Sequence, residues 1–100
     1  MRARSGPLNV TWSPPTAGTA GADVCVAYAI PTSVGNAVQR NTVRRRLRTA
    51  FAANAASLPA GDVLVRVTAS CEACTWAVIS SSVADVTRRI GRRAVARGET

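Results

Sequence analysis

The chemistry that this sequence offers is concentrated between residues 40 and 48, where nine consecutive positions hold five arginines. Arginine is a planar cation with several N–H donors, and this geometry suits the oxygens of phosphate groups. No Asp or Glu occurs from Gly35 to Ala60, so no acidic neighbour balances the repulsion between these charges. A helix of mixed charge would be interpreted as an ordinary solvated surface. An unbalanced run of arginines instead predicts contact with a nucleic acid.

The local pattern places these arginines on a helix. Asn36 is a favourable N-cap residue, and Gln39 can reach back to its backbone N–H as in a capping box. We therefore expect a helix that begins at Ala37 and ends before Pro59. At about 100° per residue, the packing face and the cationic face lie on opposite sides. The packing face comprises Val43, Leu47, Ala50, Phe51 and Asn54, and the opposite face comprises Asn41, Arg44, Arg45 and Arg48.

Side chains that act as catalysts or metal ligands are scarce. The sequence has no histidine, which removes the commonest general base and the commonest zinc ligand. Its five acidic residues are scattered, and no two of them are spaced to hold a pair of metal ions. Cys71 and Cys74 form a lone Cys-x-x-Cys with Cys25 as the only other thiol, too few for a zinc site within one chain. We therefore assign no catalytic residue and no metal ligand.

Composition narrows the class of protein. One hundred residues predict a single domain, residues 1–100, with one modest core. A net charge of +8, from 13 basic residues that are all arginine, points to a polyanionic partner. No apolar run approaches the roughly 18 residues that span a bilayer, and the start of the chain lacks the apolar core of a signal peptide. We expect a cytoplasmic protein without a membrane partner. The sequence contains no helix-turn-helix pattern, so we expect no DNA partner.

Three strands and a second helix are expected around the arginine helix. Alternating apolar residues predict strands over residues 8–12, 23–30 and 62–68. Thr75 is a plausible N-cap for the second helix, and Gly91 is predicted to end it. An apolar stripe on this helix is predicted to lie in the core. The stripe comprises Trp76, Ile79, Val83, Val86 and Ile90. We interpret Trp76 as a packing anchor in preference to a base-stacking residue. We expect residues 1–6 and 94–100 to be flexible.

A second cluster of arginines and the single residue Arg66 each allow two interpretations. Arg88, Arg89 and Arg92 lie near the expected end of the second helix, where cations either stabilise the helix dipole or contact RNA. Arg66 lies within the third strand, either on a solvated face or in a cleft for RNA. Both alternatives stay open for the cluster and for Arg66.

Residues 34–48 also form a long motif without gaps. Gly-Asn-Ala-Val at positions 35–38 leads into Arg-Asn-x-x-Arg-Arg-x-x-Arg, whose fixed residues are Arg40, Asn41, Arg44, Arg45 and Arg48. This motif closely resembles the signature of the bacterial ribonuclease P protein component, with arginine at a position where lysine is commoner. The resemblance extends more weakly from about Gly6 to Arg93.

The resemblance implies a fold. It implies an α+β domain in which a small mixed β-sheet packs with two helices, similar to domain 2 of ribosomal protein S5. A strand, a helix and a parallel strand generally form a right-handed crossover. The family is known for a left-handed β-α-β crossover at this helix, so the resemblance implies the left-handed form here.

The resemblance also implies a function. The family supplies the protein subunit of an endoribonuclease that removes the 5′ leader of precursor tRNA, and the RNA subunit catalyses the hydrolysis with bound Mg²⁺. The implied partners are ribonuclease P RNA and precursor tRNA. The implied RNA-binding residues are Asn36, Arg40, Asn41, Arg44, Arg45 and Arg48, with Arg88, Arg89 and Arg92 as a second patch. The alternative is a ribosomal or other structural RNA-binding protein with no role in an endonuclease.

The sequence departs from the family pattern at the cleft for the leader. Family members begin with a helix that carries aromatic residues, whereas this sequence starts almost at the first strand, so we expect that helix to be missing. Thr11 stands where an aromatic residue is common, and Thr32 and Ser33 stand where basic residues are usual. The implied cleft residues are Asn9, Thr11 and Arg66. Binding to the catalytic RNA is therefore better supported than binding to the leader.

Overall fold

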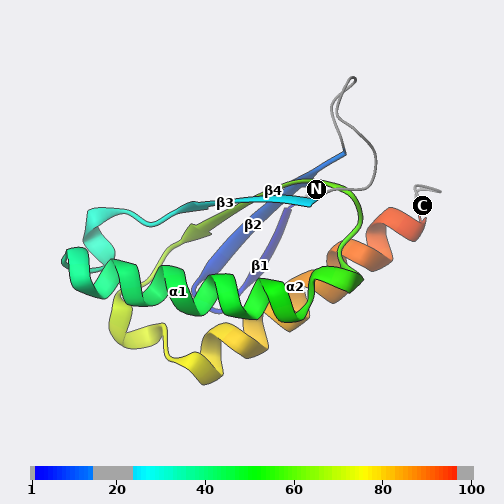
Figure 1. The fold of residues 1–100 in the computed structure, drawn as a ribbon. Helices are drawn as coiled ribbons and strands as arrows, with labels where there is room; N and C mark the ends of the chain where they lie inside the picture. Colours follow the sequence, from blue (N-terminus) through cyan, green and yellow to red (C-terminus); the bar gives the residue numbers. More distant parts are fainter. Residues whose placement is uncertain (1, 15–23, 97–100) are drawn as a thin grey trace.

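The computed structural model describes residues 2–14 and 24–96. Within these ranges a four-stranded sheet is covered on one face by two long helices (Figure 1). The strands are β1 (Arg2–Ser5), β2 (Leu8–Ser13), β3 (Val24–Ala29) and β4 (Gly61–Val67), and the helices are α1 (Ala37–Ala53) and α2 (Trp76–Ala96). Three short 3-10 helices connect them: η1 (Thr32–Val34), η2 (Ala55–Ser57) and η3 (Cys71–Ala73).

Strand β4 lies inside the sheet, whose order is β1-β2-β4-β3. It pairs antiparallel with β2 and parallel with β3. Helix α1 joins the two parallel strands, so β3, α1 and β4 form a β-α-β crossover unit. The predicted α+β class, with a mixed sheet and two helices, is confirmed. The first residue of the strand predicted over residues 23–30 lies outside the described residues.

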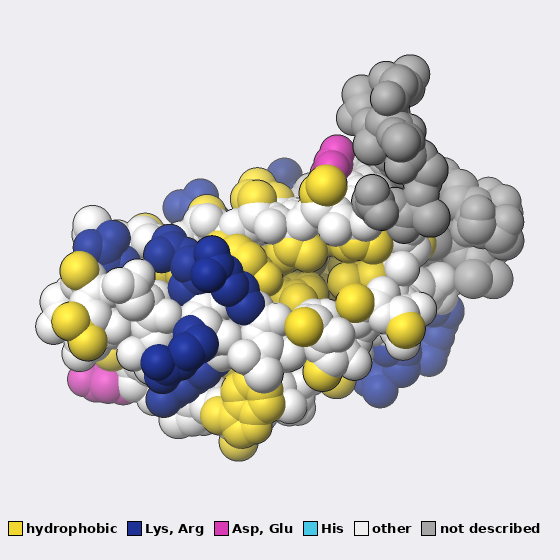
Figure 2. Space-filling model, viewed as in Figure 1, with side chains coloured by type: hydrophobic (Ala, Val, Ile, Leu, Met, Phe, Trp, Pro, Cys, Tyr) yellow, Lys and Arg dark blue, Asp and Glu magenta, His cyan; other side chains and the backbone are white. Residues whose placement is uncertain are grey.

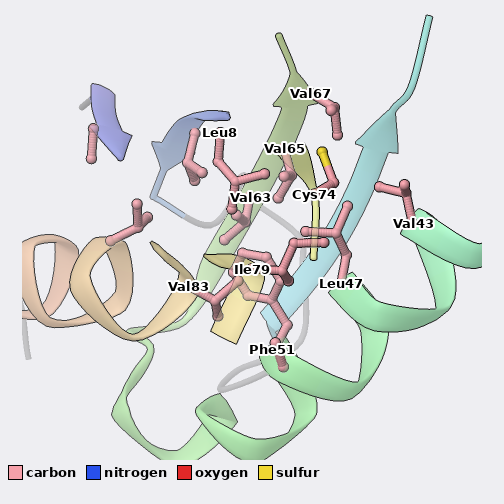
Figure 3. Packing of buried hydrophobic residues seen from close by; sticks show 14 of the residues in the cluster. Leu8, Val43, Leu47, Phe51, Val63, Val65, Val67, Cys74, Ile79 and Val83 are labelled. Carbon is pink, nitrogen blue, oxygen red and sulfur yellow. The ribbon is translucent and has the colours of Figure 1, made fainter. Parts of the chain in front are cut away.

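The sheet face that meets the helices is apolar and covered. Along β4, Val63, Val65 and Val67 are at most 2% exposed, whereas the residues between them are exposed. Figure 3 shows side chains of both helices converging on this face. The helices contribute Val43, Leu47, Ala50, Phe51, Ile79, Val83, Val86 and Ile90 to the core. The opposite face carries no helix within the described residues, and the alternate residues of β4 that point to it, Asp62, Leu64 and Arg66, are exposed.

The prediction that residues 1–6 are flexible is wrong for residues 2–6, and Met1 lies outside the described residues. Residues 2–5 form β1, which pairs antiparallel with β2 and buries Ala3. Gly6 lies in the turn between the two strands with φ of 53°, a conformation that favours glycine. Arg89 of α2 donates a hydrogen bond to the carbonyl oxygen of Arg4. The sequence pattern did not indicate this strand because Ala3 is its only apolar residue.

Helix α2 does not end at Gly91 as predicted, but continues to Ala96. A Cβ atom at position 91 would lie 3.2 Å from the carbonyl oxygen of Ser57 in η2. The absence of a side chain therefore lets the helix and the turn approach closely. Glycine inside a helix costs about 1 kcal/mol relative to alanine, and this close packing is the compensation. Residues 97–100 of the predicted flexible tail lie outside the described residues.

Trp76 is not the packing anchor that the sequence predicts. It is 46% exposed, whereas the four later members of its stripe are fully buried. Trp76 is the first residue of α2, and Cys74 fills the core at this end of the helix. The first turn of α2 therefore projects beyond the core and leaves an aromatic ring at the surface.

Candidate nucleic-acid interface

The helix that carries the arginines begins with the predicted capping box. Asn36 Oδ1 accepts a hydrogen bond from the backbone N–H of Gln39 at 2.9 Å, and the backbone N–H of Asn36 donates to Gln39 Oε1 at 2.8 Å. These two bonds satisfy donors that a helix start otherwise leaves free. A Cβ atom on Gly35 would lie 2.5 Å from Gln39 Oε1, so glycine leaves room for the returning side chain. Gly35 and Asn36 of the motif, together with Gln39, thus determine where α1 begins.

Asn36→Ala should lower the free energy of unfolding by about 1 kcal/mol, because the helix loses one half of its capping box. Urea unfolding followed by far-UV circular dichroism measures this change. Asn41→Ala is the matched control, since Asn41 is exposed on the same helix and outside the cap. The control should change stability by less than about 0.5 kcal/mol. Equal losses in the two variants would show that the cap contributes nothing to stability.

The side of α1 opposite the core presents the predicted cations. The four fixed arginines of the motif are all exposed wholly or in part: Arg40, Arg44, Arg45 and Arg48. Arg44 Nη1 donates to Asn41 Oδ1 at 3.3 Å, and Arg40 Nε donates to the Gly35 carbonyl oxygen at 3.2 Å. Figure 2 shows basic side chains gathered over α1 with no acidic side chain among them. The structure therefore places Arg44, Arg45 and Arg48 on the side of α1 away from the core, whereas Arg40 is part-buried against Gly35. Contact of these residues with RNA stays a prediction.

Arg46 lies within the same run of arginines, but its side chain makes a contact within the fold. Its Nη1 donates to the carbonyl oxygen of Cys74 at 2.8 Å and so links α1 to the segment before α2. Burial and the neighbouring Cys71 raise the pKa of the Cys74 thiol, and the charge of Arg46 opposes them only in part. Arg46 therefore makes a structural contact, which agrees with its place outside the fixed residues of the motif.

The second group of basic residues is partly used within the fold. Asp85 forms ion pairs with Arg88 at 2.9 Å and with Arg89 at 3.2 Å. A hydrogen bond from Ser5, and then the charges of Arg89 and Arg88, lower the pKa of the Asp85 carboxyl. Arg89 also bonds to β1, so its main contacts are structural. Arg88, with 64% of its side chain exposed, and the exposed Arg92 still present donors to solvent.

The uncovered face of the sheet carries the residues predicted for the leader cleft. Asn9 of β2 stands opposite Arg66 of β4, and Thr11 stands opposite Leu64. These four residues and Arg2 line a hollow of about 240 Å³. The structure therefore brings Asn9, Thr11 and Arg66 together. It adds Arg2, which the sequence did not place at this cleft because β1 was not predicted; its pairing opposite Thr11 identifies it.

Two kinds of feature are absent from the described residues. In residues 2–14 and 24–96, no group of three or more His, Cys, Asp or Glu side chains is arranged to hold a metal ion. Within the same part of the chain, no helix combines the length and the apolar character needed to cross a membrane. Of the three free cysteines, Cys25 is exposed, Cys71 is partly exposed and Cys74 is buried.

Comparisons with known proteins agree with the motif and the fold. The structure is similar to the RNase P protein of Staphylococcus aureus, with a TM-score of 0.75 and 19% identity over 89% of this chain and 79% of that one. It is equally similar to the RNase P protein of Thermotoga maritima, with a TM-score of 0.75 and 18% identity over 90% of this chain and 83% of that one. At such identities the likeness establishes the fold.

Sequence comparisons gave two results. A search of curated proteins gave no match. The family model described as Ribonuclease P matches residues 2–97, which is nearly the whole chain and includes the arginine helix, the sheet and α2. On this match, the chain belongs to the ribonuclease P protein family.

Proposed function

We propose that this chain is the protein subunit of ribonuclease P and assists removal of the 5′ leader from precursor tRNA. Its family supports a role in the holoenzyme. The observation that carries RNA binding is the arginine face of α1, where Arg44, Arg45 and Arg48 lie opposite the core without an acidic residue between Gly35 and Ala60. In this proposal the RNA subunit performs the hydrolysis, and the protein supplies binding and charge.

The geometry of α1 explains how the protein would supply that charge. The capping box and the buried side of the helix fix its position, so the backbone that carries the arginines is in place before RNA binds. Each group can donate two hydrogen bonds to one phosphate. Neutralised phosphates repel one another less, so the folded RNA needs fewer free cations. We propose that the remaining cation requirement is met by Mg²⁺, a cofactor bound mainly by the RNA. We also propose that the protein acts in the cytoplasm.

We assign the hollow on the uncovered face of the sheet to the leader strand. Arg2 and Arg66 supply positive charge at the hollow, and Asn9 and Thr11 supply hydrogen-bonding groups. Leu64 is 48% exposed between them and offers an apolar surface to a base. This arrangement suits a single strand, which presents both phosphates and unpaired bases.

The test is reconstitution with a bacterial ribonuclease P RNA and precursor tRNA at low Mg²⁺ concentration. Addition of the protein should increase the rate of leader removal and lower the Mg²⁺ concentration that cleavage requires. RNA that copurifies with the protein from its host should be a catalytic RNA of several hundred nucleotides. Copurification of ribosomal RNA alone, with no effect on cleavage, would contradict the proposal and support a structural RNA-binding protein.

A further inference from the structure

A groove between η2 and the C-terminal half of α2 is separate from both the arginine face and the uncovered face of the sheet. It has a volume of about 390 Å³. One face of α2 lines it on one side, and the residues just after α1 line it on the other. Its lining includes Thr87, Arg88, Gly91 and Arg92 of α2, together with Asn54 and Ser57. The volume lies within the roughly 300 to 1,000 Å³ of small-ligand sites, so the groove has room for a phosphate and an attached sugar.

Thr87 is one of the residues that line this groove, and it carries a buried polar atom. The residue is only 1% exposed, and its Oγ1 has no hydrogen-bond partner within the described part of the chain. A buried hydroxyl without a partner is unfavourable, and such groups are rare in folded proteins. A ligand oxygen that enters the groove and accepts a hydrogen bond from Thr87 would remove this cost.

The polar lining of the groove is positively charged. Arg88 and Arg92 are one helical turn apart on the same face of α2. Asp85 does not line the groove, and it engages one nitrogen of Arg88, Nη2, so other donors of this guanidinium remain. Asn54 Nδ2 donates to the Ala50 carbonyl oxygen at 2.8 Å, which uses one of its two amide hydrogens. The groove therefore combines two cations with additional neutral donors, and this combination suits an anion.

We propose that this groove binds a phosphate group. Arg88 and Arg92 contact its oxygens from the open side, and the Thr87 hydroxyl donates to it from the base of the groove. Gly91 makes the site possible, because its missing side chain lets Ser57 come close to α2 and form the second wall. The phosphate belongs either to the backbone of an RNA or to a free phosphate compound, and both sources share this chemistry.

Inorganic phosphate is the probe, titrated into the folded protein in chloride buffer and followed by backbone amide chemical shifts. The largest shifts should occur in η2 and around Gly91. Thr87→Val keeps the shape of the side chain and removes the hydroxyl, so phosphate affinity should fall about tenfold. Arg92→Gln should reduce it by about tenfold or more. Arg93→Gln is the matched control: Arg93 is exposed on the same helix outside the groove lining, and its loss should change affinity less than about twofold.

Circular dichroism of each variant establishes that the fold is retained. Shifts confined to the arginine face of α1, or equal phosphate affinity in Thr87→Val, Arg92→Gln and Arg93→Gln, would overturn the proposal.

Measurements with ribonuclease P RNA separate the two sources. If the groove takes a backbone phosphate of RNA, Thr87→Val should weaken RNA binding as well as phosphate binding. If it takes a free phosphate compound, RNA affinity should be unchanged while phosphate affinity falls. Both results support the groove as a phosphate site. Because the phosphate titration contains no RNA, its failure would leave the role in ribonuclease P untouched, and a failed reconstitution would leave this site untouched.

Discussion

Replacing Arg44, Arg45 and Arg48 together with glutamine should flatten the dependence of log affinity for ribonuclease P RNA on log salt concentration by about 2 to 3 units. Each phosphate contact releases roughly 0.7 to 0.9 of a counterion in simple DNA systems, so three contacts account for this change. At low salt the same variant should bind the RNA at least about a hundredfold more weakly, at about 1 kcal/mol for each lost contact. Filter binding at several salt concentrations measures both quantities.

Single replacements provide the control for this result. Arg45→Gln removes one charge from the exposed face of α1, and Arg93→Gln removes one charge from the exposed surface of α2. The net charge falls equally in both, so a general effect of charge would weaken both equally. If Arg45 contacts a phosphate of the RNA, the slope of log affinity against log salt concentration should become smaller in Arg45→Gln and stay unchanged in Arg93→Gln. A triple variant with an unchanged slope would show that the face of α1 is only solvated.

Leu47→Ala should lower the free energy of unfolding by about 3 kcal/mol. Leu47 is fully buried on the packing face of α1, and its truncation leaves a cavity that the sheet and α2 cannot easily fill. For a domain of this size that loss corresponds to a fall in Tm of roughly 12 to 24 °C. Thermal unfolding and denaturant titration both measure it. Below the transition RNA affinity should be retained, because Leu47 faces away from the cations.

Val38→Ala is the control for the core variant. Val38 lies on the same helix but is 74% exposed, so its truncation should change stability by less than about 0.5 kcal/mol. A loss below about 1 kcal/mol in Leu47→Ala would contradict the packing described for α1. A full loss of RNA binding at temperatures where the variant is folded would contradict the separation of the two faces.

Sequence reasoning succeeded where the structural signals are local. The start of α1 depends on Asn36 and Gln39, three residues apart, and the burial of Val43 and Leu47 follows from their spacing. Both were predicted correctly because each signal lies within a few turns of one helix. The alternation along β4 was equally readable, because every second residue is a valine.

The failures depend on contacts between distant segments. Strand β1 contains a single apolar residue, and it exists because β2 pairs with it and Arg89 bonds to it. Gly91 resembles a helix end in sequence, but its role is set by Ser57, a residue 34 positions away in another element. Trp76 has the right spacing for the stripe, yet the core ends at Cys74 and Ile79. Tertiary packing decided all three, and the residues alone did not specify it.

The place of β4 inside the sheet has a consequence for synthesis. During translation β2, β3 and α1 all leave the ribosome before β4, although β4 is the strand that joins β2 to β3. The hairpin of β1 and β2 is marginal on its own, and the sheet cannot be completed until residue 67 has emerged. Until then, the apolar face of α1 is not covered by the complete sheet. The arginines of α1 have already left the ribosome at this stage and can contact RNA. The nascent chain should therefore acquire its cationic helix before its core, and RNA present at that stage would encounter a partly folded protein.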